Sequence, residues 1–176
     1  MRIFTTYNLI IIALTIVLSG CIVQSRQLNG LLELIKDPPI DLSTNSWLVR
    51  YSDYESIVYA VSTSEGTLFS NKAGDKVLFD GWTVRKVEGM GRRQINMNIS
   101  DKKNIRTFKR AHRTLSNHRC NQWEQQKNLG AARYTQYCSD KRGYKNSILV
   151  KDNGDISVIR QIVDERYTAL TLTKLK

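Results

Sequence analysis

From residue 47 onward, short runs of branched and aromatic residues alternate with polar residues and are separated by turn signals. Runs of this kind occur at residues 47–51, 56–61, 76–79, 82–87 and 94–99, and they are typical of half-buried β-strands. Asp80 and Gly81 separate two of the runs, which favours a hairpin or a bulge there. The pattern therefore predicts consecutive strands that are joined by short turns.

The clearest hairpin lies near the end of the chain. Residues 146–151 and 156–163 form two strand-like runs around residues 152–155, where Asn153 and Gly154 tolerate the positive φ angles of tight turns. A last strand is predicted at residues 167–175, in which threonines alternate among leucines. Successive short strands with short turns predict a mainly β chain, a single antiparallel meander that forms a curved sheet, a sandwich or an open barrel.

Residues 104–118 follow a different period. On a helix, Arg106, Lys109, Arg110 and Arg113 would share one face, and the opposite face would carry the residues Ile105, Phe108, Ala111, His112 and Leu115. A strand would give poorer alternation. Periodicity therefore predicts a further helix near 104–118.

The start of the chain carries one continuous apolar run. Residues 9–18 read LIIIALTIVL, and Arg2 is the only charged residue before Cys21. A membrane-spanning helix needs about 20 apolar residues, so this shorter run, followed by small residues, indicates an export signal. Residues 25–36 predict a short amphipathic helix that the prolines at 38 and 39 end.

The four residues Leu18, Ser19, Gly20 and Cys21 resemble the lipobox of bacterial lipoproteins. The resemblance implies cleavage before Cys21 and acylation of its thiol by chains such as palmitate. Ile22 follows the cysteine, where an aspartate would favour retention at the inner membrane, so the outer membrane is the expected location. An uncleaved anchor helix with an incidental cysteine is the alternative.

Charge is the unusual feature of the composition. The chain has 27 lysines and arginines against 16 acidic residues, a formal net charge of +11. Residues 85–119 hold eleven of these cations and two acids, a net charge of +9. A concentrated basic surface attracts polyanions, and export argues against nucleic acid as the partner. The expected partners are anionic polysaccharide or lipid at Arg106, Lys109, Arg110 and Arg113, and a solvated face without a ligand is the alternative.

The remaining cysteines and the histidines give few signs of chemistry. Cys120 and Cys138 are an even pair in a chain bound for an oxidising compartment, which predicts a disulfide. His112, His118 and Cys120 match no standard metal spacing, and no nucleophile elbow, zinc-protease motif or phosphate-binding loop occurs. We expect no enzyme, cofactor or metal. Three tryptophans, Trp47, Trp82 and Trp123, could stack on sugar rings, but packing in the core is the preferred role for them.

The last third of the chain resembles the group 4 capsule polysaccharide lipoproteins. The similarity lies in the segments Cys120-Asn121-Gln122-Trp123-Glu124, Tyr144-Lys145-Asn146, Gly154-Asp155-Ile156, Arg160-Gln161 and Leu175-Lys176. It covers roughly 55 residues plus the leader, and it implies a non-enzymatic role beside polysaccharide-export proteins at the outer membrane. The similarity does not extend to the basic segment before Cys120, where the family pattern favours strand over helix.

Three parts of the chain are therefore expected. They are a signal peptide at 1–20, a lipidated N-terminus with a short helix and linker at 21–46, and an antiparallel β domain at 47–176. The predicted function is that of an outer-membrane lipoprotein, an accessory in export or assembly of a cell-envelope polysaccharide. The alternatives are a stand-alone periplasmic binding or inhibitor lipoprotein and a hydrolase that uses His112 or His118.

Overall fold

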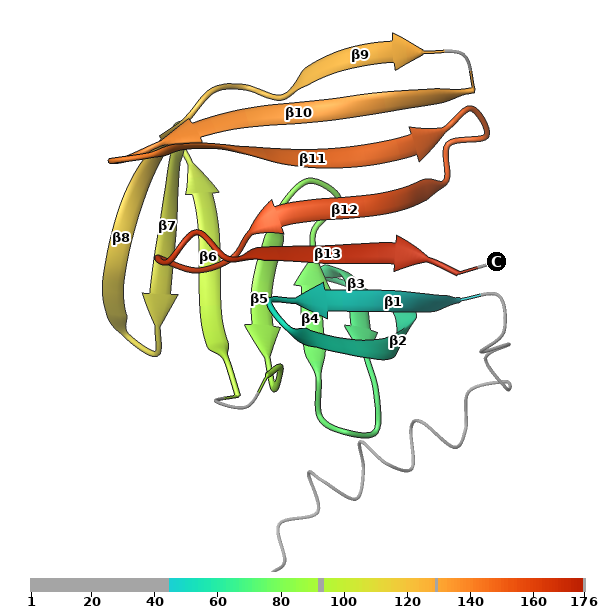
Figure 1. The fold of residues 1–176 in the computed structure, drawn as a ribbon, viewed down its shortest axis with the longest axis horizontal. Coiled ribbons are helices and arrows are strands. Elements are labelled where there is room, and N and C mark those ends of the chain that lie inside the picture. The colour runs from blue at the N-terminus through green and yellow to red at the C-terminus, as the bar shows by residue number, and fades with distance from the viewer. Residues whose placement is uncertain (1–44, 92–93, 129, 176) are drawn as a thin grey trace, which may run out of the picture. The chain divides into compact units, whose positions relative to one another are not determined.

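A computed structural model describes residues 45–91, 94–128 and 130–175, and these residues belong to one compact unit. The expected signal peptide, Cys21 and the predicted helix at 25–36 lie outside the described residues. The described chain holds thirteen antiparallel strands and no helix (Figure 1). In chain order they are β1 (Ser46–Tyr51), β2 (Tyr54–Thr63), β3 (Gly66–Ser70), β4 (Lys76–Phe79), β5 (Val84–Glu88), β6 (Asn96–Lys102), β7 (Ile105–Arg110), β8 (Arg113–Cys120), β9 (Glu124–Asn128), β10 (Ala131–Ser139), β11 (Gly143–Lys151), β12 (Ile156–Ile162) and β13 (Ala169–Lys174).

The predicted antiparallel meander is confirmed, and it closes into a barrel. Nearly every strand pairs with its neighbours in the sequence, β1 pairs with β13, and β8 pairs with β10, so that twelve strands form a ring. The remaining strand, β9, pairs with β10 outside this ring. Figure 1 shows the strands β10 to β13 and β1 running across the strands β4 to β8, so that the barrel is built from two crossed walls.

The barrel is filled by side chains that alternate with outward-facing ones along each strand. A cluster of apolar residues occupies most of the interior, and its fully buried members include Val49, Val58, Val77, Phe108, Ile159, Leu170 and Leu172. Trp47 packs edge-on against Phe69 in this cluster, with ring centroids 5.0 Å apart. The preferred packing role of Trp47 is therefore confirmed.

The two predicted turns form where glycine permits them. Gly81 adopts a φ of 101° between β4 and β5, and the register of these strands shifts at Leu78 and Phe79, which is a bulge. Gly154 adopts a φ of 86° between β11 and β12, whereas Asn153 does not take a positive φ. The late hairpin therefore has a longer turn than one built from Asn153 and Gly154 alone.

The helix predicted near 104–118 does not form. This segment is the hairpin of β7 and β8, in which Arg106 pairs with His118 and Phe108 pairs with Ser116. Polar residues occupy inward positions of both strands, so the apolar residues do not alternate along the chain. Their spacing fits a helical period by coincidence. On β7 the inward positions are Arg106 and Phe108, and on β8 they are Ser116, His118 and Cys120.

Candidate functional site

The barrel is closed beside the predicted disulfide. Cys120 at the end of β8 and Cys138 on β10 are bonded to each other, are directly paired in register, and have Cα atoms 4.0 Å apart. Only one further residue pair, Arg119 with Ser139, joins these two strands. The disulfide therefore reinforces the shortest strand pairing of the ring.

Arg106 lies inside the barrel and not on the surface where it was expected. Its guanidinium is fully buried, and it donates to Asp101 Oδ2, Gln161 Oε1 and the carbonyl of Ile162, each at 3.0 Å. Burial lowers the pKa of Arg106, and the nearby charge of Asp101 opposes that change. The expectation that Arg106 contacts a polyanion is wrong for the folded protein, because a fully buried side chain cannot reach a polymer at the surface.

A polar network extends from Arg106 across the interior. Gln161 also accepts from the amide of Val84 at 3.0 Å and donates to the carbonyl of Trp82. Asn146 accepts from the amide of Ile162 at 2.9 Å and donates to Gln136. These bonds tie β7, β10, β11, β12 and the turn before β5 together, so the network spans both walls.

The two histidines lie in different surroundings. His112 is exposed in the turn between β7 and β8, whereas His118 is almost fully buried. The ring of His118 lies among Phe108, Tyr144 and Tyr167, and its Nδ1 is 2.9 Å from the Tyr144 hydroxyl. Burial lowers the pKa of His118, which favours the neutral ring.

The other three predicted contacts are exposed on the β7–β8 hairpin. Lys109 and Arg110 are at the end of β7, and Arg113 pairs with Arg110 at the start of β8. Further exposed cations continue this surface at Lys102 on β6, Arg119 on β8, and Lys141 and Arg142 in the turn between β10 and β11. We call these seven residues the basic face: Lys102, Lys109, Arg110, Arg113, Arg119, Lys141 and Arg142.

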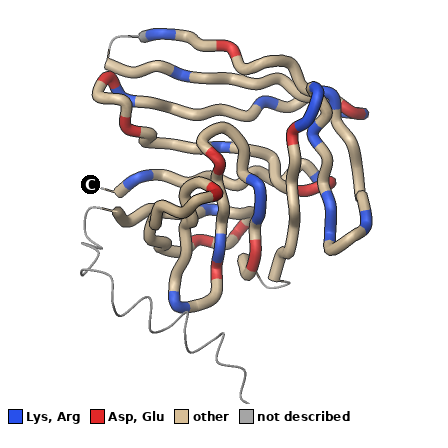
Figure 2. The backbone as a smooth tube through the Cα atoms, turned by 180° about the vertical axis from the view of Figure 1, so that it is seen from behind, with Lys and Arg blue, Asp and Glu red and all other residues tan. Residues whose placement is uncertain are grey.

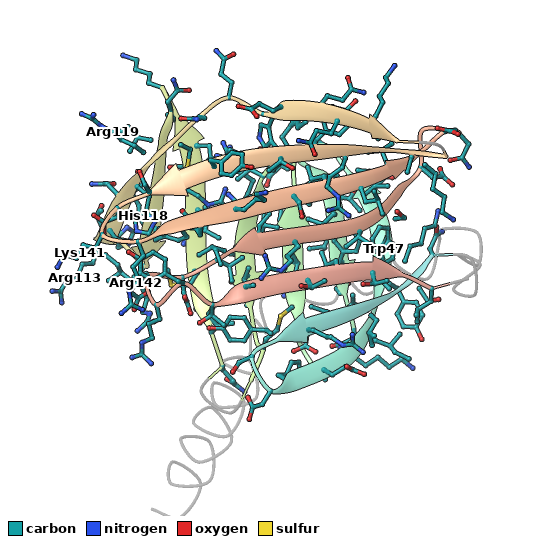
Figure 3. All side chains as sticks on the ribbon, turned by 45° about the horizontal axis from the view of Figure 1, so that its top comes forward. Trp47, Arg113, His118, Arg119, Lys141 and Arg142 are labelled. Atoms are coloured by element: carbon teal, nitrogen blue, oxygen red, sulfur yellow. A yellow bond between two sulfur atoms is a disulfide. The ribbon has the colours of Figure 1, made fainter. Side chains whose placement is uncertain are left out.

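The strand register places Lys102, Lys109 and Arg119 on the outside of one wall, whereas Arg110 and Arg113 are partners at the tip of the β7–β8 hairpin. Lys102, Ile105, Arg119 and Ser139 are successive partners across β6, β7, β8 and β10, and partners in adjacent strands point to the same side. Figure 2 shows Lys and Arg along these strands with few acidic residues between them. In Figure 3, Arg113, Arg119, Lys141 and Arg142 project from the end of the molecule opposite Trp47.

The cations of the basic face are poorly neutralised. Within the described part of the chain, Arg110 has a distant partner in Glu165 at 3.9 Å, and the other six form no ion pair. One acid, Asp140, lies in the turn that carries Lys141 and Arg142. The face thus keeps a strong positive potential, and it extends along β8, which is about 25 Å long at 3.3 Å per residue.

A cleft of about 710 Å³ opens where two turns meet the segment between β8 and β9. Trp82 from the turn before β5 and Trp123 before β9 line it, with ring centroids 5.7 Å apart. Trp82 is 47% exposed. The preference for a packing role is therefore wrong for Trp82, because the glycine turn at residue 81 carries its side chain out of the core.

No cluster of three or more His, Cys, Asp or Glu side chains with the geometry of a metal site was found among the described residues. The same residues include no helix with the length and apolar character needed to cross a bilayer. No known family model matches the chain, and neither a curated protein nor a solved structure matches it.

Proposed function

We propose that this protein is an outer-membrane lipoprotein, anchored through Cys21 at the periplasmic face, which assists the export or assembly of an acidic cell-envelope polysaccharide. Its role is non-enzymatic, and the basic face contacts the polymer. The observation that carries the proposal is the set of six exposed cations without ion pairs, among the described residues, on β6, the β7–β8 hairpin and the turn between β10 and β11. An extended strip of charge suits a linear polyanion better than a single small anion.

Three further observations support the location and the role. The segment before Cys21 is typical of a lipoprotein signal, the disulfide suits an oxidising compartment, and the last third resembles the capsule polysaccharide lipoproteins. The barrel interior is occupied by side chains, which leaves the outer surface for binding a polymer. In the periplasm, acidic polysaccharide is an abundant polyanion, whereas nucleic acid is scarce.

The binding test compares polygalacturonate with the same polymer after chemical reduction of its carboxyl groups. The full-length protein should bind the acidic form more tightly, and added salt should weaken this binding because exposed charges are screened beyond about 8 Å at physiological ionic strength. Replacing Lys109, Arg113 and Arg119 with Gln should lower the affinity at low salt by about tenfold. Equal affinity for both polymers, independent of salt, would contradict the proposal.

A charge-matched control uses three exposed cations outside the basic face. Lys72, Lys151 and Arg160 are replaced with Gln, which removes the same net charge from other surfaces. This variant should keep most of the affinity if position matters, and it should lose as much as the first variant if only net charge matters. For both variants, the free energy of unfolding should differ from that of the natural protein by no more than about 0.5 kcal/mol per substitution, since exposed side chains contribute little to stability.

The anchor is tested separately by mass spectrometry of protein from bacterial membranes. The natural protein should begin at Cys21 and carry acyl chains, and Cys21→Ser should accumulate as an unprocessed precursor. An unacylated mature protein, or one that begins elsewhere, would contradict the anchor and leave the binding test unaffected.

A further inference from the structure

The cleft beside the basic face combines an exposed aromatic surface with polar groups. Trp82 lies edge-on to Tyr134 at 5.2 Å between ring centroids and is tilted against Trp123. Tyr134 and Trp123 are only partly exposed and pack against the core. Trp82 is therefore supported from within the barrel while much of its own ring surface remains open to solvent.

The backbone of Trp82 is fixed independently of its side chain. Its amide donates to Asp80 Oδ1 at 3.0 Å, and its carbonyl accepts from Gln161 Nε2 at 2.6 Å. Both bonds use main-chain atoms of Trp82, so the position of this residue is set by the turn and by the interior network. A half-exposed tryptophan that is held in place by its main chain leaves ring surface free for contact with a ligand.

The charges that border the cleft largely neutralise one another. Asp80 forms an ion pair with Arg85 at 3.2 Å, and Asp101 forms one with Arg106 at 3.0 Å. Lys103 is exposed at the rim, beside Lys102 of the basic face. The floor and walls thus favour an uncharged ligand, while the rim is continuous with a positive surface.

Uncommitted amide groups complete the lining. The side chains of Asn104, Asn121 and Gln122 line the cleft and form no hydrogen bond with other residues of the described chain. Each carboxamide offers a donor and an acceptor in one plane. Such groups match the vicinal hydroxyls of a sugar, which donate and accept at neighbouring positions.

We infer that this cleft binds one or two pyranose units of a polysaccharide chain, with the C–H face of a sugar ring against Trp82. The side-chain amides of Asn121 and Gln122 form hydrogen bonds with the hydroxyl groups of the sugar. The inference rests on the proposed function and adds a site for the neutral ring to the basic face that attracts acidic groups. A chain seated in the cleft passes Lys103 at the rim and continues onto the basic face.

The test measures binding of neutral hexasaccharides of glucose, galactose, mannose and N-acetylglucosamine to the full-length protein by calorimetry. At least one should bind, and Trp82→Ala should weaken it by about tenfold or more, a change that corresponds to about 1.4 kcal/mol. Ile57→Ala is the matched control, because Ile57 on β2 is 48% exposed and lies outside the cleft. The control should bind as the natural protein does.

Two further variants separate the cleft from the basic face and from a loss of folding. Asn121→Ala should weaken binding of the same sugar without removing any aromatic surface, and its melting temperature should match that of the natural protein. Trp82→Ala should stay folded with a somewhat lower melting temperature, because it loses its ring contacts with Trp123 and Tyr134. The variant with Gln at 109, 113 and 119 should bind the neutral sugar normally. If no hexasaccharide binds, or if Trp82→Ala binds as well as the natural protein, the inference is overturned, whereas loss of preference for polygalacturonate would overturn only the proposed function.

Discussion

The barrel interior has two unlike regions. One is an apolar region whose buried members include Val49, Val58, Leu170 and Leu172, and the other is the polar network around Arg106. The apolar region is stabilised by area removed from water, which depends little on direction. The polar network depends on each buried group finding a partner with the right geometry, because an unpaired buried polar group costs about 1–3 kcal/mol. We therefore expect substitutions that alter side-chain shape in the apolar region to reduce stability less than substitutions that remove a hydrogen-bond partner from the polar network.

The largest expected effect comes from breaking the network at its centre. Arg106→Ala leaves Asp101, Gln161 and the carbonyl of Ile162 without their shared donor, and it should destabilise the protein by about 3–5 kcal/mol. Arg106→Lys should recover less than half of this loss, because one ammonium cannot reproduce the planar fork of a guanidinium. Urea unfolding followed by circular dichroism gives both values, and a loss below about 1 kcal/mol for Arg106→Ala would show that the network is dispensable.

A slightly smaller effect is expected from the apolar region. Leu172 on β13 is fully buried, and Leu172→Ala should cost about 2–5 kcal/mol through lost burial and the cavity that remains. Here the conservative change behaves differently: Leu172→Met should cost less than about 1.5 kcal/mol, because a flexible apolar chain of similar volume refills the space. If Leu172→Met proved as damaging as Arg106→Lys, the contrast between the two regions would fail.

Removing the disulfide should have a comparable or smaller effect. Cys120 and Cys138 are 18 positions apart, and closing a loop of that size is worth about 3 kcal/mol on the chain-entropy model. Replacing both cysteines with Ala should lower the unfolding free energy by about this amount, and reducing agent should then have no further effect on the variant. Equal stability of the natural protein with and without reductant would contradict this prediction.

The smallest effect concerns the neutral ring of His118. Its pKa in the folded protein lies below its ordinary value of 6.5, so the unfolded chain binds the proton first as the pH falls. The contribution of His118 to the free energy of unfolding should therefore be greatest above pH 6.5 and should decline as the pH falls from there toward the lower pKa of the folded state. His118→Phe should remove this part of the pH dependence. The measurement is the urea midpoint of both proteins between about pH 5 and pH 8, in buffers that differ only in pH.

The same contrast explains what the sequence could predict. Strands whose inward residues are apolar, such as β1, β4 and β13, were predicted within a few positions. The hairpin of β7 and β8 was mistaken for a helix, and β10 was not predicted, because arginine, histidine, threonine and glutamine occupy inward positions there. The strand β9 was not predicted because it lies outside the ring and its sequence is polar throughout. Alternation identifies a strand only when the buried face is apolar, and two of the three partners of the buried Arg106 are 55 and 56 positions away in the sequence.

The site was partly predictable for a similar reason. The disulfide followed from cysteine pairing, and the exposure of Lys109, Arg110 and Arg113 followed from their charge. The cleft could not be found, since Trp82 and Trp123 meet only when the turn before β5 lies beside the segment after β8. The glycine at position 81, followed directly by a tryptophan, was the one local signal that Trp82 belongs to a turn.

The pairing of β1 with β13 makes the first and the last strand neighbours, and the amide of Leu175 donates to the carbonyl of Ser46 at 2.9 Å. A ring of strands that closes on itself has no position at which the chain must begin. A circular permutant that links residue 175 to residue 45 and opens in the exposed turn at residues 152–155 should keep the same neighbours and the same interior. The order in which the strands are synthesised is thus separable from the order in which they stand around the barrel.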